Sequence, residues 1–160
     1  MRAVTSIQQW VNFSVATPNQ DAIAICLEEA KKPYKGFNTY YGWISNEYLR
    51  KRDLLVGVLD MSGMTPYVPE GGFFIMADTS QIRFPYNKNE ITDAMPTFPM
   101  PRDWSMNRWL TKVVGVTAIP PSAFYEEERV YLAQNMLRFA FCKSDSLLVE
   151  AHNRFDKYFS

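Results

Sequence analysis

The segment Leu137-Arg138-Phe139-Ala140-Phe141-Cys142-Lys143 places one arginine inside an apolar run that is typical of a β-strand. An arginine side chain stays ionised at physiological pH, so its burial is costly unless an anion meets it. The planar guanidinium can bind a carboxylate through two parallel hydrogen bonds. Two interpretations follow. Arg138 is either a carboxylate-binding residue on a rigid strand or a strand-end arginine paired with an Asp or Glu of the same chain.

The patterns around this segment indicate an α+β fold. The expected elements follow the order helix, helix, strand, strand, helix, strand, strand, helix. This order favours a mixed or antiparallel sheet with helices packed on one face. Their ranges are 17–33, 46–62, 64–68, 73–77, 104–114, 116–119, 137–142 and 146–159, with a turn or short helix at 125–133.

Local signals define several of these elements. Thr17 and Gln20 predict a capping box at the start of the first helix, with Pro18 in its first turn. Gly63 is placed to end the second helix, and the sequence 69–72, Pro-Glu-Gly-Gly, predicts a hairpin turn. The last helix is amphipathic, and the side chains expected to face inward are those of Leu148, Ala151, Phe155 and Tyr158.

Composition limits the classes of function. The 160 residues are 47% hydrophobic with a formal net charge of zero, so we expect a folded domain and neither a nucleic-acid nor a membrane-surface partner. Cys26, Cys142 and His152 are too few and too scattered for a zinc site, so no metal is expected. No apolar run approaches a membrane span, and unpaired thiols suit a cytoplasmic or otherwise intracellular protein.

The remaining reactive residues have ordinary structural interpretations. His152 is expected to be a solvent-facing helix residue, and Cys142 a packed core thiol. Gly71 and Gly72 lie between strands, so they form a turn and not a phosphate-binding loop. Ser122 follows two prolines without a histidine base and is expected to be a loop or cap residue. The residues alone thus give one unusual arginine and no self-contained catalytic set.

A set of motifs occurs in the order found in one enzyme family. These are Phe13-Ser14-Val15 with Thr17-Pro18-Asn19-Gln20, Tyr48–Asp53, Pro69–Asp78, Arg108-Trp109-Leu110, Val116–Phe124 and Leu137–Phe141. Together they resemble, over essentially all 160 residues, the C-terminal part of a class I/II, fold-type I, pyridoxal-phosphate-dependent aminotransferase. Within that family the chain looks most like the branch of kynurenine aminotransferases, glutamine transaminases and cysteine-conjugate β-lyases.

The resemblance implies a role for each part of the chain. Arg138 would bind the α-carboxylate of an amino-acid or 2-oxo-acid substrate, in a homodimeric parent that transfers amino groups with pyridoxal 5'-phosphate. Residues 1–40 would be the end of the large cofactor-binding domain, and residues 41–160 the small domain, beginning with the long inter-domain helix. Phe13 to Thr17 would lie near the active site and dimer interface, and the proline-rich segment 85–101 near the entrance. Some relatives carry an aromatic residue and a histidine where Val15 and Ala16 stand.

The resemblance also implies what the chain lacks. The family's Schiff-base lysine and its cofactor-binding residues lie upstream of every motif present, so the chain should contain no catalytic or cofactor-binding residue and should be inactive alone. Met1 to Val4 reads like the middle of a helix, which suggests a piece of a longer protein. Residues 1–40 would normally pack on the rest of the large domain, so we expect exposed apolar surface there. The alternative is a free-standing, non-enzymatic α+β module that binds an acidic ligand through Arg138.

Overall fold

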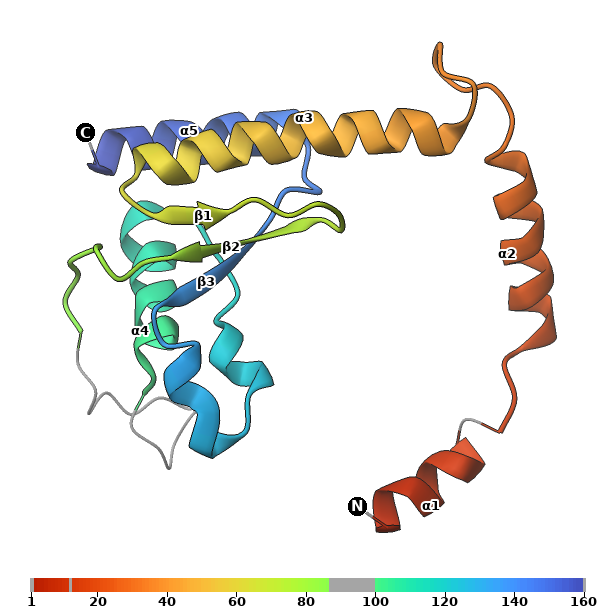
Figure 1. Ribbon diagram of the computed structural model, residues 1–160, viewed down its shortest axis with the longest axis horizontal. Coiled ribbons are helices and arrows are strands. Elements are labelled where there is room, and N and C mark those ends of the chain that lie inside the picture. The colour runs from red at the N-terminus through yellow and green to blue at the C-terminus, as the bar shows by residue number, and fades with distance from the viewer. Residues whose placement is uncertain (1, 12, 87–99, 160) are drawn as a thin grey trace. The chain divides into compact units, whose positions relative to one another are not determined.

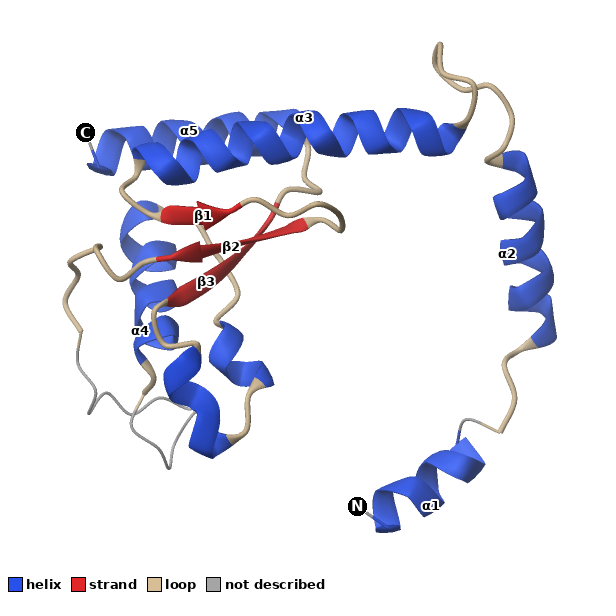
Figure 2. Ribbon diagram, viewed as in Figure 1, coloured by secondary structure: helices blue, strands red, loops and turns tan. Residues whose placement is uncertain are grey.

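The computed structural model describes residues 2–11, 13–86 and 100–159. The chain divides into two compact units, Met1–Glu47 and Tyr48–Ser160. The elements are labelled in Figure 1, and Figure 2 separates helices from strands. The domain boundary expected after residue 40 remains a prediction. Most of the proline-rich segment 85–101 lies outside the described residues.

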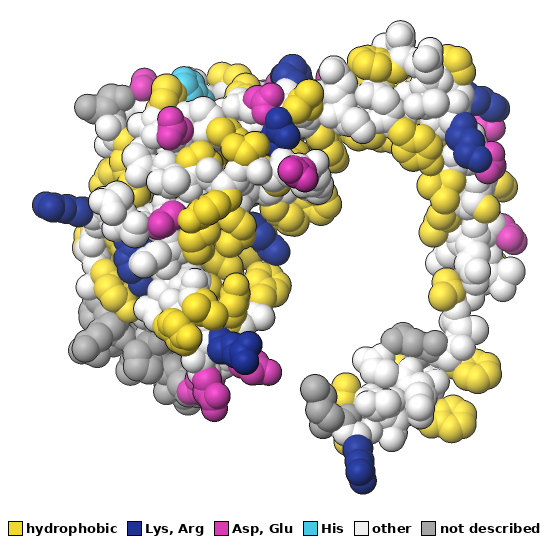
Figure 3. All heavy atoms as spheres, viewed as in Figure 1, with side chains coloured by type: hydrophobic (Ala, Val, Ile, Leu, Met, Phe, Trp, Pro, Cys, Tyr) yellow, Lys and Arg dark blue, Asp and Glu magenta, His cyan; other side chains and the backbone are white. Residues whose placement is uncertain are grey.

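The first unit contains α1 (Arg2–Val11), α2 (Thr17–Glu29) and the beginning of α3 (Tyr40–Met61). The predicted capping box is wrong, because no side chain caps α2 and its first turn is closed by the Ala16 carbonyl. The Gln20 side chain instead donates to the Val15 carbonyl at 3.1 Å. Large apolar side chains of α1, α2 and the segment between them are exposed, as expected, and Figure 3 shows them in yellow.

Helix α3 begins earlier than its predicted start at residue 46. Thr39 is its N-terminal cap, because the Thr39 hydroxyl accepts the N–H of Gly42 at 3.1 Å. The helix ends at Met61, and Gly63 follows with a φ of +81°, as its predicted role requires.

The second unit contains an antiparallel sheet of β1 (Thr65–Tyr67), β2 (Phe74–Asp78) and β3 (Met136–Ala140), in the order β1-β2-β3. Side chains of β2 and β3 alternate between buried and half-buried along each strand. Ile75 pairs with Phe139 on the buried face, and Met76 pairs with Arg138 on the other face. The register therefore places Arg138 on the sheet face opposite the core.

Three helices cover the buried face of the sheet: α3, α4 (Arg102–Trp109) and α5 (Asp145–Phe159). Within this unit α3 and α5 lie side by side, as Figure 1 shows. This arrangement confirms the predicted α+β class with helices packed on one face of the sheet. The core residues contributed by the helices and strands are Leu55, Val58, Leu59, Ile75, Ala77, Met106, Leu110, Leu137, Phe139 and Phe155.

Two predictions about this unit are wrong. Tyr158 of α5 was expected to face inward but is 45% exposed, whereas Leu148 and Phe155 are buried. Residues 116–119 were expected to form a strand but pair with β3 only at Ile119, through a two-way backbone bridge to Arg138. The Ala118 N–H points away from β3 and donates to the Asn107 side chain at 2.8 Å, which ties this segment to α4.

Short helical turns complete the second unit. α4 continues into a π-helical turn, Leu110–Val114, and Gly115 follows with a φ of +83°. Two 3-10 turns, Pro121–Phe124 and Glu127–Leu132, connect this region to β3. None of the described helices has both the length and the apolar character needed to cross a membrane.

Candidate carboxylate-binding site

Arg138 is held by its backbone on two sides. It sits in the middle of β3, paired with Met76 of β2 on one side. On the other side its N–H donates to the Ile119 carbonyl at 3.0 Å, and its carbonyl accepts the Ile119 N–H at 2.9 Å. Its Cα is therefore fixed by neighbours from both directions, and the half-buried side chain leaves the sheet on the face away from the core.

Two phenylalanine rings flank the guanidinium of Arg138. Its central carbon lies 4.3 Å from the ring centroid of Phe74 and 4.6 Å from that of Phe124. A cation in contact with an aromatic ring gains about 0.5–2 kcal/mol, depending on how far it is removed from water. The rings also restrict the rotamers of a long, flexible side chain, so the guanidinium is held in place before any ligand arrives.

The guanidinium of Arg138 has hydrogen-bond donors to spare. Its Nε atom is buried, and within the described ranges no hydrogen bond or ion pair reaches the side chain. A buried donor without an acceptor costs about 1–3 kcal/mol, and more when the group is charged. The strand-end ion pair considered from the sequence is therefore absent from the described part of the chain. The arrangement suits an acceptor that is supplied by another molecule.

Arg102 shows how a structural arginine differs from Arg138. Its guanidinium donates to Thr79 Oγ1 at 3.0 Å, to the Thr79 carbonyl at 2.8 Å and to the Ile82 carbonyl at 3.1 Å. It also stacks on the ring of Phe84, 5.1 Å from the centroid. Burial lowers the pKa of this group, with nearby Asp78 opposing the shift. Its donors are used within the protein, which leaves Arg138 as the better candidate for a ligand.

A buried carboxylate anchors the turn that carries Phe124. Asp103, in the first turn of α4, is fully buried. Its two oxygens accept from Ser122, one from the backbone N–H at 2.9 Å and one from the hydroxyl at 2.9 Å. Burial raises the pKa of Asp103, and the hydrogen bonds from Ser122 oppose that shift. Ser122 is thus a buried residue of a connecting turn, and both of its donors serve structural hydrogen bonds.

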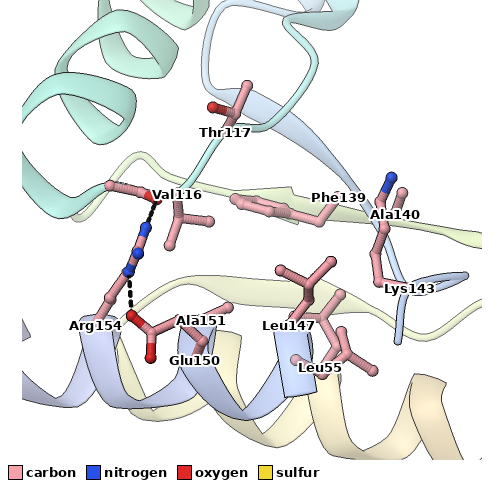
Figure 4. Close-up of a pocket in the computed structure, with 12 residues that line it drawn as sticks. Leu55, Val116, Thr117, Phe139, Ala140, Lys143, Leu147, Glu150, Ala151 and Arg154 are labelled. Carbon is pink, nitrogen blue, oxygen red and sulfur yellow. Dashed lines mark hydrogen bonds and ion pairs between the residues drawn. The ribbon is translucent and has the colours of Figure 1, made fainter. Parts of the chain in front are cut away.

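A separate cleft of about 240 Å³ lies between residues 116–117, β3 and α5 (Figure 4). Its floor is apolar, with Leu55 and Phe139 among its lining residues. The Arg154 side chain at one end donates to the Gly115 carbonyl and, at 2.7 Å, to Glu150, as the dashed lines show. Arg138 does not line this cleft, so the cleft is not part of the candidate site.

The other reactive residues lie apart from this arrangement. His152 is half-buried on α5 rather than fully solvent-facing, and Cys142 is a half-buried free thiol rather than a fully packed one. Gly72 has a φ of +74° in the turn between β1 and β2, which agrees with the predicted role of the two glycines. Nothing described brings any of these residues into the surroundings of Arg138.

The described lysines do not provide a cofactor site. A Schiff-base lysine needs a sheltered amine of lowered basicity. Lys51 is the only described lysine that is not exposed, and its ammonium lies 3.8 Å from an Asp145 oxygen. The residues in hand therefore do not fit pyridoxal phosphate. The guanidinium of Arg138 has the geometry to bind a carboxylate.

Sequence reasoning identified Arg138 but missed its neighbours. Phe74 and Phe124 were part of recognised motifs, yet no local pattern shows that their rings meet one guanidinium. Sequence reasoning did not single out Asp103, which lies in the first turn of α4. Its burial depends on residues 120–124 folding over it, which a sequence pattern does not show.

Comparison with known proteins shows which proteins the chain as a whole is similar to. No protein-family model matches the sequence. The kynurenine–oxoglutarate transaminase of Dictyostelium discoideum is 39% identical over 151 residues, which are 94% of this chain and 34% of that protein. The crystal structure of Bna3p from Saccharomyces cerevisiae matches with a TM-score of 0.74 and 30% identity over 93% of this chain and 33% of that one.

A third match comes from YbdL of Escherichia coli, which has a methionine aminotransferase function. Its TM-score is 0.66 at 28% identity, over 95% of this chain and 33% of that one. The chain thus spans about one third of the length of the relatives that it matches. These matches favour an aminotransferase over the free-standing binding module. By sequence and by fold, the chain belongs to the fold-type I aminotransferases, of which it corresponds to the C-terminal part.

Proposed function

We propose that this chain supplies the substrate-carboxylate site of an aminotransferase that transfers an amino group between an amino acid and a 2-oxo acid. The observation that carries the proposal is Arg138, whose guanidinium lies between Phe74 and Phe124 with a buried donor that no described residue accepts. Amino acids and 2-oxo acids share a carboxylate next to the reacting carbon. One arginine can therefore hold both substrates in turn with the same pair of hydrogen bonds.

The residues of this chain bind and orient the substrate. Arg138 would fix the carboxylate, and the two rings would keep the guanidinium from rotating away, so the reacting carbon is presented in one direction. The family implies pyridoxal phosphate, which supplies the electron sink for amino-group transfer when bound. The described residues form no site for it, so we assign cofactor binding and the Schiff-base lysine to the part of the relatives that this chain does not match.

The domain assignment and partners are part of the same proposal. Residues 1–40 would belong to the large cofactor-binding domain and residues 41–160 to the small domain, in a homodimeric parent. The named relatives indicate kynurenine with 2-oxoglutarate as the first substrates to test, whereas the function of YbdL makes methionine the second.

The test uses the longest reading frame that contains this sequence. The purified protein, with pyridoxal phosphate added, is assayed for transfer from kynurenine or methionine to 2-oxoglutarate. We expect Arg138→Ala to lower kcat/KM by about 100-fold for both substrates, because removing one partner of a sheltered charge pair costs about 2–5 kcal/mol. Arg138→Lys should retain part of the activity, because it keeps the charge without the fork.

Arg83→Ala is the matched control, because Arg83 is an exposed arginine in the same unit. Its kcat/KM should equal that of the wild type. Equal activity of the wild type and Arg138→Ala would remove Arg138 from substrate binding. Absence of transfer to any 2-oxo acid by the wild type would contradict the aminotransferase itself.

A further inference from the structure

The ring of Phe124 lies over Arg138 but is not packed in the hydrophobic core. Phe124 is 66% exposed and belongs to a 3-10 turn of four residues, Pro121–Phe124. So short a turn has little stability by itself, because its few hydrogen bonds are weaker than those of an α-helix. Something else must therefore hold Phe124 over the guanidinium, 4.6 Å from its central carbon.

The hydrogen bonds of the turn identify that support. Within the turn, the Tyr125 N–H donates to the Ser122 carbonyl at 3.1 Å, which closes it. Ser122 is tied to α4 by its backbone N–H and by its hydroxyl, and both donate to the carboxylate of Asp103. Asp103 is fully buried and Ser122 almost so, and hydrogen bonds of this kind are strong where water is excluded.

A second connection holds the beginning of the same segment. The Asn107 side chain, one turn further along α4, accepts the N–H of Ala118, and Ile119 is bridged to the backbone of Arg138. Residues 118 to 122 are thus fastened to α4 at both ends and to β3 in between. The position of Phe124 relative to Arg138 is consequently set by α4. The contact with α4 that lies nearest to Phe124 along the chain is the pair of hydrogen bonds from Ser122 to Asp103.

We propose that Asp103 is a positioning residue for Arg138: it locks the Pro121–Phe124 turn so that Phe124 covers the guanidinium and orders it for a carboxylate. This inference rests on the proposed function for the identity of the ligand, but its geometric part does not. Asp103 touches neither the ligand nor Arg138 in this scheme, and it acts only through Ser122 and Phe124.

The experiment observes the Arg138 side chain in the full 160-residue chain by nuclear magnetic resonance. An aromatic ring shifts the resonance of a proton held over its face, so the Nε–H signal of Arg138 reports on Phe124. The signal is assigned by its loss in Arg138→Lys, and Phe124→Leu gives its position without the ring. We expect Asp103→Ala to move the signal to the Phe124→Leu position, and to weaken binding of 2-oxoglutarate about three- to tenfold.

Asp103→Asn is the conservative rescue. Its amide oxygen can accept the Ser122 N–H and its NH₂ can donate to the Ser122 hydroxyl, so the wild-type signal should return. Ser122→Ala keeps only the backbone bond and should give an intermediate shift, which also serves if Asp103→Ala does not fold. Ser62→Ala is the matched control, because Ser62 is another buried serine whose hydroxyl donates one bond, to the Leu59 carbonyl at 2.7 Å.

The outcomes separate this inference from the proposed function. An Arg138 signal that stays at its wild-type position in both Asp103→Ala and Ser122→Ala would overturn the positioning role. A shift of equal size in Ser62→Ala would also overturn it, because general loss of stability would then explain the effect. The predicted shift of the signal in Asp103→Ala, together with a wild type that binds no 2-oxoglutarate, would support the positioning role and contradict the proposed ligand.

Discussion

At some positions of this protein the backbone geometry requires one residue type, and Gly115 is a clear example. Its φ of +83° is left-handed, and a β-carbon there would lie 2.9 Å from Nη1 of Arg154. Gly115→Ala should therefore lower the free energy of unfolding by about 1–2 kcal/mol, mainly through backbone strain. Denaturant unfolding measures this change.

Gly57 provides the control for that substitution. It lies inside α3, and a β-carbon there would meet nothing within 4 Å. Gly57→Ala should raise the free energy of unfolding by about 0.5–1 kcal/mol, because alanine loses less backbone freedom in a helix. A Gly115→Ala variant that is as stable as the wild type, while Gly57→Ala gains stability, would show that the conformation assigned to Gly115 is incorrect.

The buried carboxyl of Asp103 should make stability depend on pH. Its pKa in the folded protein is raised above the ordinary value of 3.8, so folding favours the protonated form. Its stabilising contribution is fully present below pH 3.8 and is lost as the pH rises through the folded pKa. We expect the wild type to lose stability relative to Asp103→Asn over that range, as measured by unfolding at a series of pH values. A difference that does not change with pH would contradict the burial of a carboxyl.

Helices α3 and α5 are joined by an ion pair with the opposite pH dependence. Arg50 donates to both carboxylate oxygens of Asp145 at 2.9 Å, and this hydrogen bonding lowers the pKa of Asp145. The contribution to stability is present above the unfolded pKa and is lost as the pH falls through the lower folded pKa.

Asp145→Asn should therefore be less stable than the wild type at neutral pH and equal to it in strong acid. Because both side chains are substantially exposed, added salt should shrink the difference. Unfolding curves at low and high salt test this, and a difference that grows with salt would exclude an ion pair as its cause.

Most elements were predictable from periodicity, but their ends and one strand were not. The apolar stripes predicted α3, α4, α5, β2 and β3, because each element has a buried face that repeats with its own period. Residues 116–119 have the composition of a strand, yet among them only Ile119 pairs with β3. The extent of that pairing depends on how the segment lies against β3 in the folded chain, so the local pattern could not show it. The same holds for the rings around Arg138.

Many large apolar side chains are exposed in the described part of the chain. In the Met1–Glu47 unit, Trp10 is 78% and Phe13 80% exposed, and Val15 and Ile25 are also exposed. Exposed apolar side chains of this kind promote association in water. We expect the chain of 160 residues to self-associate, and a shorter chain of residues 40–160 to do so less.

Sedimentation at several concentrations measures that association. Trp10→Gln combined with Phe13→Gln is the point-substitution form of the test, and it should shift the full chain towards the monomer. A full chain that stays monomeric at high concentration would show that the exposed apolar residues of this unit are covered in solution.

The most direct test of the whole account is a titration of the chain with 2-oxoglutarate, observed at the arginine Nε–H resonances. We expect a saturable shift of the Arg138 signal, because no described residue bonds its guanidinium and a carboxylate bound to the Nη groups would change the surroundings of the Nε–H. The signal of Arg102, whose Nη groups already bond to Thr79 and Ile82, should not move. Saturable binding that leaves the Arg138 signal unchanged, or no binding at all, would contradict the assignment of Arg138 as the substrate-carboxylate site.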